Sequence, residues 1–270
     1  MEQNQVFPKQ RLYTACMEQA YKYLQSLYMD KLDEQIEELC TYRGYVDDAH
    51  RKLFKELKIG YCSVIDLEDL GEYRSEIGLV TKSDGFLLDN RFIIPVYDIS
   101  NRLNTMIGYY PDNKKYITVS APFFSKNHMF LNFRNAYDLA YDKYNGTVIL
   151  VEGVFDCLSL RSIGLPAMAT MGSDVTPEKG ELLKLFRKVI AIPDDDKTGR
   201  LSLDRNSKRG WKVPSNTTMI KLVGGEVDYG DYKFHIKDMD DFVKFYEPQD
   251  VEECLMQFVD SREDIETLKL

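Results

Sequence analysis

Acidic residues follow three separate apolar segments of the chain, at 147–151, 189–192 and 217–223. The acids that follow these segments are Glu152, Asp194, Asp196, Asp238 and Asp240. Carboxylates held close together repel one another unless a cation neutralises them, and a site made only of oxygen ligands suits Mg²⁺ or Mn²⁺. If the fold brings these acids together, they form a divalent-metal site.

Each acid also has a simpler interpretation, because a single acid after a strand is usually a helix N-cap or a solvated loop residue. Their joint placement favours metal binding. Asp194 and Asp196 are two residues apart, so an extended backbone directs both side chains the same way. Gly153 and Gly199 leave room for the backbone to approach a ligand closely.

The second half of the chain alternates short apolar runs with helical patterns. Such continuous apolar runs are typical of parallel strands that are covered on both faces. Thr176 and Pro177 are the expected N-cap and first residue of one intervening helix. In an open parallel sheet the functional crevice lies beyond the carboxyl ends of the strands. The predicted fold class is therefore α/β, with the acids at one edge of the sheet.

The part of the chain before this α/β domain has a different pattern. Apolar residues recur at helical spacing up to Gly60, and short β-type runs extend from about Gly78 to Phe133. These runs predict an antiparallel or mixed sheet. The predicted organisation is an N-terminal helical segment at 1–65, a mixed α+β subdomain at 66–145, a parallel-sheet domain at 146–248 and a short helical tail at 249–270.

Composition excludes several classes of protein. The 270 residues carry a net charge of −9, which argues against a large basic surface for nucleic acid but leaves room for a local basic groove. No run approaches the roughly 20 apolar residues that span a bilayer, and the N-terminus lacks the apolar core of a signal peptide, so a cytoplasmic protein is expected. The five cysteines form no CxxC pair and there are only three histidines, so no zinc site is expected.

The acidic segments resemble the Toprim domain of DnaG-type bacterial and phage primases, topoisomerases and some nucleases. The matching order is a strand and Glu152-Gly153, then AMATMGS, then a strand and Asp194-x-Asp196-x-x-Gly199-Arg200, then Lys237-Asp238-x-Asp240. The stretches VEGVFDCLSL and DDDKTGR are most similar to the primase version. Upstream, YRGYVDDAHRKLFKELKIGYCS, NRFIIPVYDISNRLNTMIGYY and KKYITVSAPFFSKNHMFLN resemble primase segments as well, so the resemblance covers about 40–246.

The resemblance implies a primase catalytic core, which makes short RNA primers on single-stranded DNA from ribonucleoside triphosphates. It implies that two divalent metals, Mg²⁺ or Mn²⁺, are held by Glu152, Asp194, Asp196, Asp238 and Asp240. It also implies a groove for template, primer or incoming nucleotide, lined by Arg91, Lys115, Tyr116 and Lys126. Cations and an aromatic ring suit that role, although exposed lysines also serve solubility alone.

The sequence departs from the family pattern at two places. Asp195 stands where the family has a glycine between its two aspartates, and aspartate is among the few residues that tolerate the turn conformation a glycine favours. The segment 107–110 reads IGYY where the family has a phosphate-binding arginine. The second departure predicts weaker or differently arranged nucleotide binding.

Full-length primases of this type add a zinc ribbon and a helicase-binding domain. The cysteines here cannot build the first, and the residues after 249 are too few for the second. We therefore expect a minimal or split primase, such as phages or mobile elements encode, that works with a separate zinc-bearing subunit or a replicative helicase. A Toprim metal-dependent nuclease and a non-catalytic nucleic-acid-binding accessory subunit are the alternatives. A topoisomerase is poorly supported, because its cleaving tyrosine lies in a large separate gate domain.

Overall fold

The computed structural model describes residues 3–63, 65–120, 128–172, 174–195, 197–203, 210–229 and 232–269. The chain forms two compact units, Met1–Lys126 and Asn127–Leu270. Among the described residues, no helix is both long enough and apolar enough to cross a membrane. The finer division into four segments stays a prediction.

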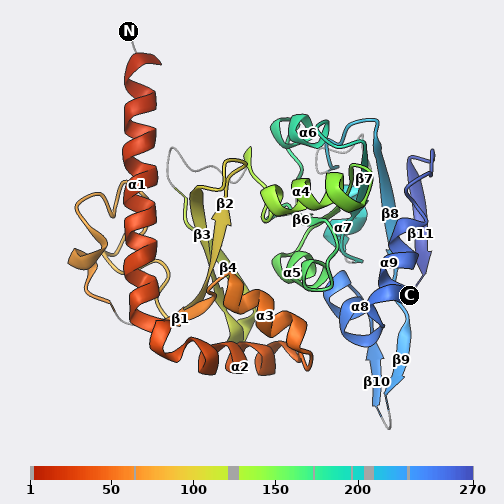
Figure 1. Cartoon of the computed structure of the whole chain (residues 1–270), viewed down its shortest axis with the longest axis horizontal. Helices are drawn as coiled ribbons and strands as arrows, with labels where there is room; N and C mark the ends of the chain where they lie inside the picture. Colours follow the sequence, from red (N-terminus) through yellow and green to blue (C-terminus); the bar gives the residue numbers. More distant parts are fainter. Residues whose placement is uncertain are drawn as a thin grey trace. The chain divides into compact units, whose positions relative to one another are not determined.

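The first unit consists of helices followed by an antiparallel sheet (Figure 1). Its helices are α1 (Gln3–Tyr28), α2 (Leu32–Arg43) and α3 (Asp48–Glu56), with short 3-10 helices at Met29–Lys31, Leu67–Leu70 and Pro111–Asn113. Its strands, in hydrogen-bonded order, are β1 (Gly60–Cys62), β2 (Arg91–Tyr97), β3 (Leu103–Tyr110) and β4 (Lys115–Thr118). Of the two sheet types expected from the sequence, the antiparallel one forms.

Local sequence explains where these helices begin and end. Helix α2 ends at Gly44, whose φ of +75° is a conformation that glycine adopts without strain. Helix α3 follows Asp47, whose side chain accepts a hydrogen bond from the backbone N–H of His50. Gly60, at the start of β1, packs so closely against the Tyr28 ring that a β-carbon there would lie 2.2 Å from it. This contact joins the end of α1 to the edge of the sheet.

The second unit is built on a five-stranded sheet (Figure 1). Its strands are β5 (Thr147–Val151), β6 (Ala167–Ala169), β7 (Lys188–Ile192), β8 (Thr217–Val223) and β11 (Ile265–Lys269), in the order β11-β8-β7-β5-β6. All neighbouring pairs are parallel. Its helices are α4 (Phe133–Lys143), α5 (Val154–Ser162), α6 (Pro177–Leu183), α7 (Lys197–Ser202), α8 (Met239–Phe245) and α9 (Pro248–Met256). The predicted α/β fold with a parallel sheet is confirmed.

The core of the second unit lies between the sheet and its covering helices. All five residues of β5 are buried, as the continuous apolar run predicted. Trp211 is fully buried in the same cluster as Phe133 of α4 and Val189 of β7. A separate hairpin, β9 (Glu226–Tyr229) and β10 (Tyr232–His235), forms a two-stranded sheet of its own and connects β8 to α8.

The end of the chain differs from the predicted helical tail. Helix α9 forms as expected, but the last residues form β11, which pairs in parallel with β8 from Ile265↔Met219 to Lys269↔Val223. Only Leu268 of this strand is buried. A five-residue edge strand with one buried side chain has almost no apolar pattern in its sequence. Its strand structure depends on pairing with β8, which is distant along the chain.

Candidate metal centre

The register of the parallel sheet brings Glu152 and Asp194 to the same edge. Val151 at the end of β5 pairs with Ile192 at the end of β7. Glu152 follows Val151 directly and Asp194 follows Ile192 after one proline, so both acids lie just beyond the carboxyl ends of neighbouring strands. The carboxylate oxygen Oε2 of Glu152 is buried. Asp196, the other predicted ligand of this loop, lies outside the described residues.

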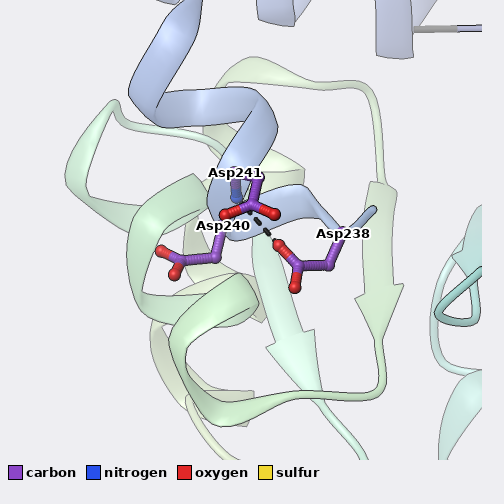
Figure 2. Close-up of side chains that lie close together, drawn as sticks. All are labelled: Asp238, Asp240 and Asp241. Atoms are coloured by element: carbon purple, nitrogen blue, oxygen red, sulfur yellow. Dashed lines mark hydrogen bonds between the residues drawn. The ribbon is translucent and has the colours of Figure 1, made fainter. Parts of the chain in front are cut away.

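A compact group of three acids lies at the start of α8. Asp238, Asp240 and Asp241 each offer an oxygen within 4.8 Å of the others (Figure 2). Asp238 is the N-cap of α8, and its Oδ1 accepts a hydrogen bond of 2.8 Å from the backbone N–H of Asp241. The helix N-terminus therefore supplies donors and a favourable dipole to a group of like charges.

Asp240 is held by protein donors on both of its oxygens. The hydroxyl of Ser159 donates to Oδ1 at 2.5 Å, and Nζ of Lys244 lies 2.7 Å from Oδ2. The side chain is almost fully buried, so the Lys244 ammonium stabilises a carboxylate that burial alone would disfavour. The Ser159 contact ties α8 to α5, and the Lys244 contact holds Asp240 from within α8.

Asp156 belongs to this network and was missed in the sequence analysis. It lies in the first turn of α5, is buried, and accepts a hydrogen bond of 2.8 Å on Oδ1 from the backbone N–H of Asp240. Burial, and then the charges of Asp238, Asp194 and Asp240, raise the pKa of the Asp156 carboxyl well above its ordinary value. An acid within the otherwise apolar start of this helix, four residues after Glu152, is the signal that could have identified it.

The electrostatics of the cluster favour a bound cation. The pKa of Asp238 is also raised, first by burial and then by the negative charge of Asp241. A divalent cation would remove the repulsion that disfavours the charged forms, and every side chain concerned offers oxygen, the donor atom that Mg²⁺ and Mn²⁺ prefer. The donor set therefore fits a divalent metal. Glu152 and Asp194, although described, are not part of the compact three-acid group.

We expect Asp156→Asn to stabilise the metal-free protein at neutral pH and raise its Tm by a few degrees. The raised pKa means that folded Asp156 keeps its proton at pH values where the unfolded chain has released it. Tighter proton binding by folded Asp156 stabilises the folded state at low pH. This stabilisation is complete below the pKa of Asp156 in the unfolded chain, and it is lost as pH rises through the pKa in the folded state. Asparagine keeps the Oδ1 acceptor for Asp240 and carries no such pH dependence.

Urea unfolding in EDTA at a series of pH values from 4 to about 8 measures this effect, because stability that depends on protonation changes with pH. The variant should show a shallower loss of unfolding free energy than the wild type as pH rises. An equal slope in both proteins would contradict the assignment of a raised pKa to Asp156.

The predicted nucleic-acid-binding residues lie in the first unit. Lys115 on β4 pairs with Tyr110 on β3, and the guanidinium carbon of Arg91 on β2 lies 5.5 Å from the centroid of the Tyr110 ring. Tyr116 is 43% exposed, with its ring centroid 5.1 Å from that of Tyr109. The structure therefore places Arg91 on β2 and both Lys115 and Tyr116 on β4, the two strands on either side of β3, whereas Lys126 lies outside the described residues.

Arg91 borders a pocket of about 440 Å³ in the same unit. Its tyrosines are Tyr42, Tyr61 and Tyr110, and the pocket also contains carboxylates. The Arg91 chain crosses β3 at Gly108, where a β-carbon would lie 2.5 Å from Cδ of the arginine. Gly108 thus leaves room for the Arg91 side chain to reach Tyr110. Tyr110 lies in the segment 107–110, where the family pattern has a phosphate-binding arginine.

Comparison with known proteins shows similarity to DNA primases. Residues 149–232 match a family model described as Toprim-like. The chain is 27% identical over 209 residues to a DNA primase of Clostridium acetobutylicum, covering 74% of this chain and 32% of that protein. The chain is a homologue of the DnaG-type DNA primase catalytic domain. Its second unit contains the Toprim domain that the acidic motifs predicted.

Another curated protein and two solved structures are similar to this chain as well. A DNA primase of Thermotoga maritima is 30% identical over 142 residues, which are 50% of this chain and 24% of that protein. A DnaG primase catalytic domain solved bound to single-stranded DNA has the same fold, with a TM-score of 0.64 and 17% identity over 93% of this chain and 83% of that one. The RNA polymerase domain of Mycobacterium tuberculosis DnaG matches with a TM-score of 0.66 and 14% identity, over 91% and 82% of the two chains. The primase homologue spans about a third or less of the length of the curated relatives it matches.

Proposed function

We propose that this chain is a primase catalytic core that synthesises short RNA primers on single-stranded DNA from ribonucleoside triphosphates. The observation that carries the proposal is the buried acid network at the carboxyl edge of a Toprim sheet, in a chain homologous to DNA primases. Burial and mutual repulsion raise the pKa values of the clustered carboxylates, and bound cations would stabilise their charged forms at neutral pH. Nucleotide transfer requires such cations at the reacting phosphates.

The acids of the second unit are the proposed metal ligands: Glu152, Asp194, Asp196, Asp238 and Asp240. When bound, two divalent cations would neutralise the triphosphate and stabilise the attacking and leaving oxygens of an in-line displacement. Among the chain's own residues, Ser159 and Lys244 hold Asp240 in place, and the N-terminus of α8 holds Asp238. Glu152, Asp194 and Asp196 have the proposed catalytic role of placing these cations at the reacting phosphate.

The first unit is proposed to bind nucleic acid and nucleotide through Arg91, Lys115, Tyr116 and Lys126. The exposed Tyr116 ring offers a face for base stacking, and Arg91 and Lys115 offer charges for phosphates. Its pocket tyrosines supply further stacking surfaces beside the guanidinium of Arg91. A separate zinc-bearing subunit or replicative helicase is the proposed partner, in the cytoplasm of a bacterial cell or a phage-infected host.

Primer synthesis on single-stranded DNA with labelled ribonucleotides tests the proposal. The expected result is oligoribonucleotides that appear with Mn²⁺ or Mg²⁺ and disappear when EDTA is added. If the chain alone is inactive, the reaction is repeated with a replicative helicase and a zinc-bearing primase subunit. Absence of product in every combination would overturn the proposal.

A Toprim nuclease is the second candidate, because the same acids could activate water against a phosphodiester. The acid cluster favours it as much as it favours a primase, but the similarity to primases extends through the first unit as well. Incubating the chain with labelled single-stranded DNA, metal and no nucleotides separates the two. Metal-dependent cleavage that needs no triphosphate would reverse the ranking.

A further inference from the structure

The carboxylate of Asp195 accepts hydrogen bonds from two protein donors. Nη1 of Arg200 on α7 donates to Oδ1 at 3.0 Å, and the backbone N–H of Gly224, just after β8, donates to Oδ2 at 3.4 Å. Each oxygen of Asp195 thus has a protein donor, and the side chain is only 20% exposed. This is the arrangement of a residue that holds a loop in place.

The backbone of Asp195 reaches the segment that carries the acids of α8. Its N–H donates to the carbonyl oxygen of Lys237 at 3.4 Å, and Lys237 directly precedes Asp238. The same segment closes the base of the β9–β10 hairpin, where the N–H of Ile236 donates to the carbonyl of Gly225 at 2.9 Å. Figure 1 shows this hairpin extending from the end of β8 beside α8. Asp195 therefore contacts three segments that meet beside Asp194 and Asp238.

Close backbone packing leaves these segments little freedom. A β-carbon at Gly224 would lie 2.2 Å from the carbonyl oxygen of Ile236. A β-carbon at Gly199, next to Arg200, would lie 1.9 Å from the carbonyl oxygen of Asp194. Both glycines let backbone pack directly on backbone, so the contacts of Asp195 lie among closely packed segments.

We infer that Asp195 is a positioning residue that, with Arg200, sets the placement of Asp194 relative to Asp238 for divalent-metal binding. The inference rests on the proposed metal centre. A glycine at this position, as in the family pattern, has no side chain to make the Arg200 and Gly224 contacts. In this chain the side chain of the middle residue supplies contacts between the loop and its neighbours.

Electrostatics and loop positioning predict opposite effects of Arg200→Gln on the affinity for a divalent cation. Arg200→Gln removes a positive charge near the acids, so electrostatics alone predicts tighter binding of a divalent cation. If Arg200 acts by holding Asp195, the loop loses a charge-assisted contact and cation binding weakens. The Arg200 side chain is 57% exposed, so the substitution should leave the fold intact.

The experiment is Mn²⁺ binding to the whole chain, measured by electron paramagnetic resonance and by titration calorimetry. Arg200→Gln is expected to bind Mn²⁺ up to about fivefold more weakly than the wild type, the size of one partly exposed ion pair. Arg200→Lys keeps the charge and a donor, and should bind nearly as tightly as the wild type. The matched control is Arg134→Gln, which breaks an exposed ion pair of 2.8 Å with Asp138 on α4 in the same unit and should leave binding unchanged.

Two contrary outcomes are distinguishable. If the wild type binds Mn²⁺ and Arg200→Gln binds it equally or more tightly, the positioning role of Asp195 is overturned and the metal centre stands. If the wild type binds no Mn²⁺, the metal centre and the positioning role fail together. Equal Tm values for the variants would show that a change in affinity is not a loss of fold.

Discussion

Primer synthesis by Asp194→Ala is expected to fall at least about 100-fold below the wild type, because even residues that only support metal ligands typically cost 10- to 100-fold. Mn²⁺ affinity should fall with it. The unfolding free energy of the metal-free protein should stay the same or rise, because the negative charge of Asp194 is one of those that raise the pKa of Asp156. Removing that charge relieves repulsion in the buried network.

The matched control is Asp250→Ala, which removes an exposed acid from the first turn of α9 in the same unit. It should leave synthesis and Mn²⁺ binding unchanged. The measurements are primer synthesis with saturating Mn²⁺, calorimetric Mn²⁺ titration, and urea unfolding in EDTA. Wild-type synthesis by Asp194→Ala would remove this residue from the proposed metal centre.

The strands of the second unit were predictable because burial on both faces leaves a direct trace in sequence. The run at 147–151 is continuously apolar, and all of β5 is buried. Thr176 was also predictable as an N-cap, and its side chain accepts a hydrogen bond from the Lys179 N–H. Such features depend on a few neighbouring residues. The pairing of β11 with β8 joins segments more than forty residues apart, so no local pattern indicated it.

The candidate site was also predictable only in part from the sequence. The strand ends placed Glu152 and Asp194 at one edge, because the carboxyl ends of parallel strands meet there. The role of Asp156 was not predictable from spacing alone, since it depends on α8 packing against α5 and on the Asp240 N–H reaching its Oδ1. The same packing gives Asp240 its Ser159 partner, whereas Lys244 lies one turn further along α8 itself. Sequence patterns therefore located the acids, while tertiary packing decides which of them are tied to protein donors.

Gly199→Ala is expected to impair the metal centre although it replaces none of the acids. The added β-carbon would lie 1.9 Å from the carbonyl oxygen of Asp194, far inside van der Waals contact, and the obstacle is backbone that cannot rotate away. The loop that carries Asp194 must therefore shift. A displacement of about 1 Å in a catalytic arrangement commonly costs on the order of 100-fold in rate, and overpacking costs roughly 1–3 kcal/mol in stability.

Gly85→Ala in the first unit is the control for replacing a glycine by alanine where no backbone lies in the way. A β-carbon there would meet only Oγ1 of Thr81, at 3.3 Å, so neither Mn²⁺ affinity nor primer synthesis should change. Mn²⁺ affinity is measured well below the Tm of each variant, so that a loss reports the position of Asp194 and not unfolding. If Gly199→Ala binds Mn²⁺ like the wild type, the backbone of Asp194 is free to move without consequence. The close packing of this loop would then serve stability alone.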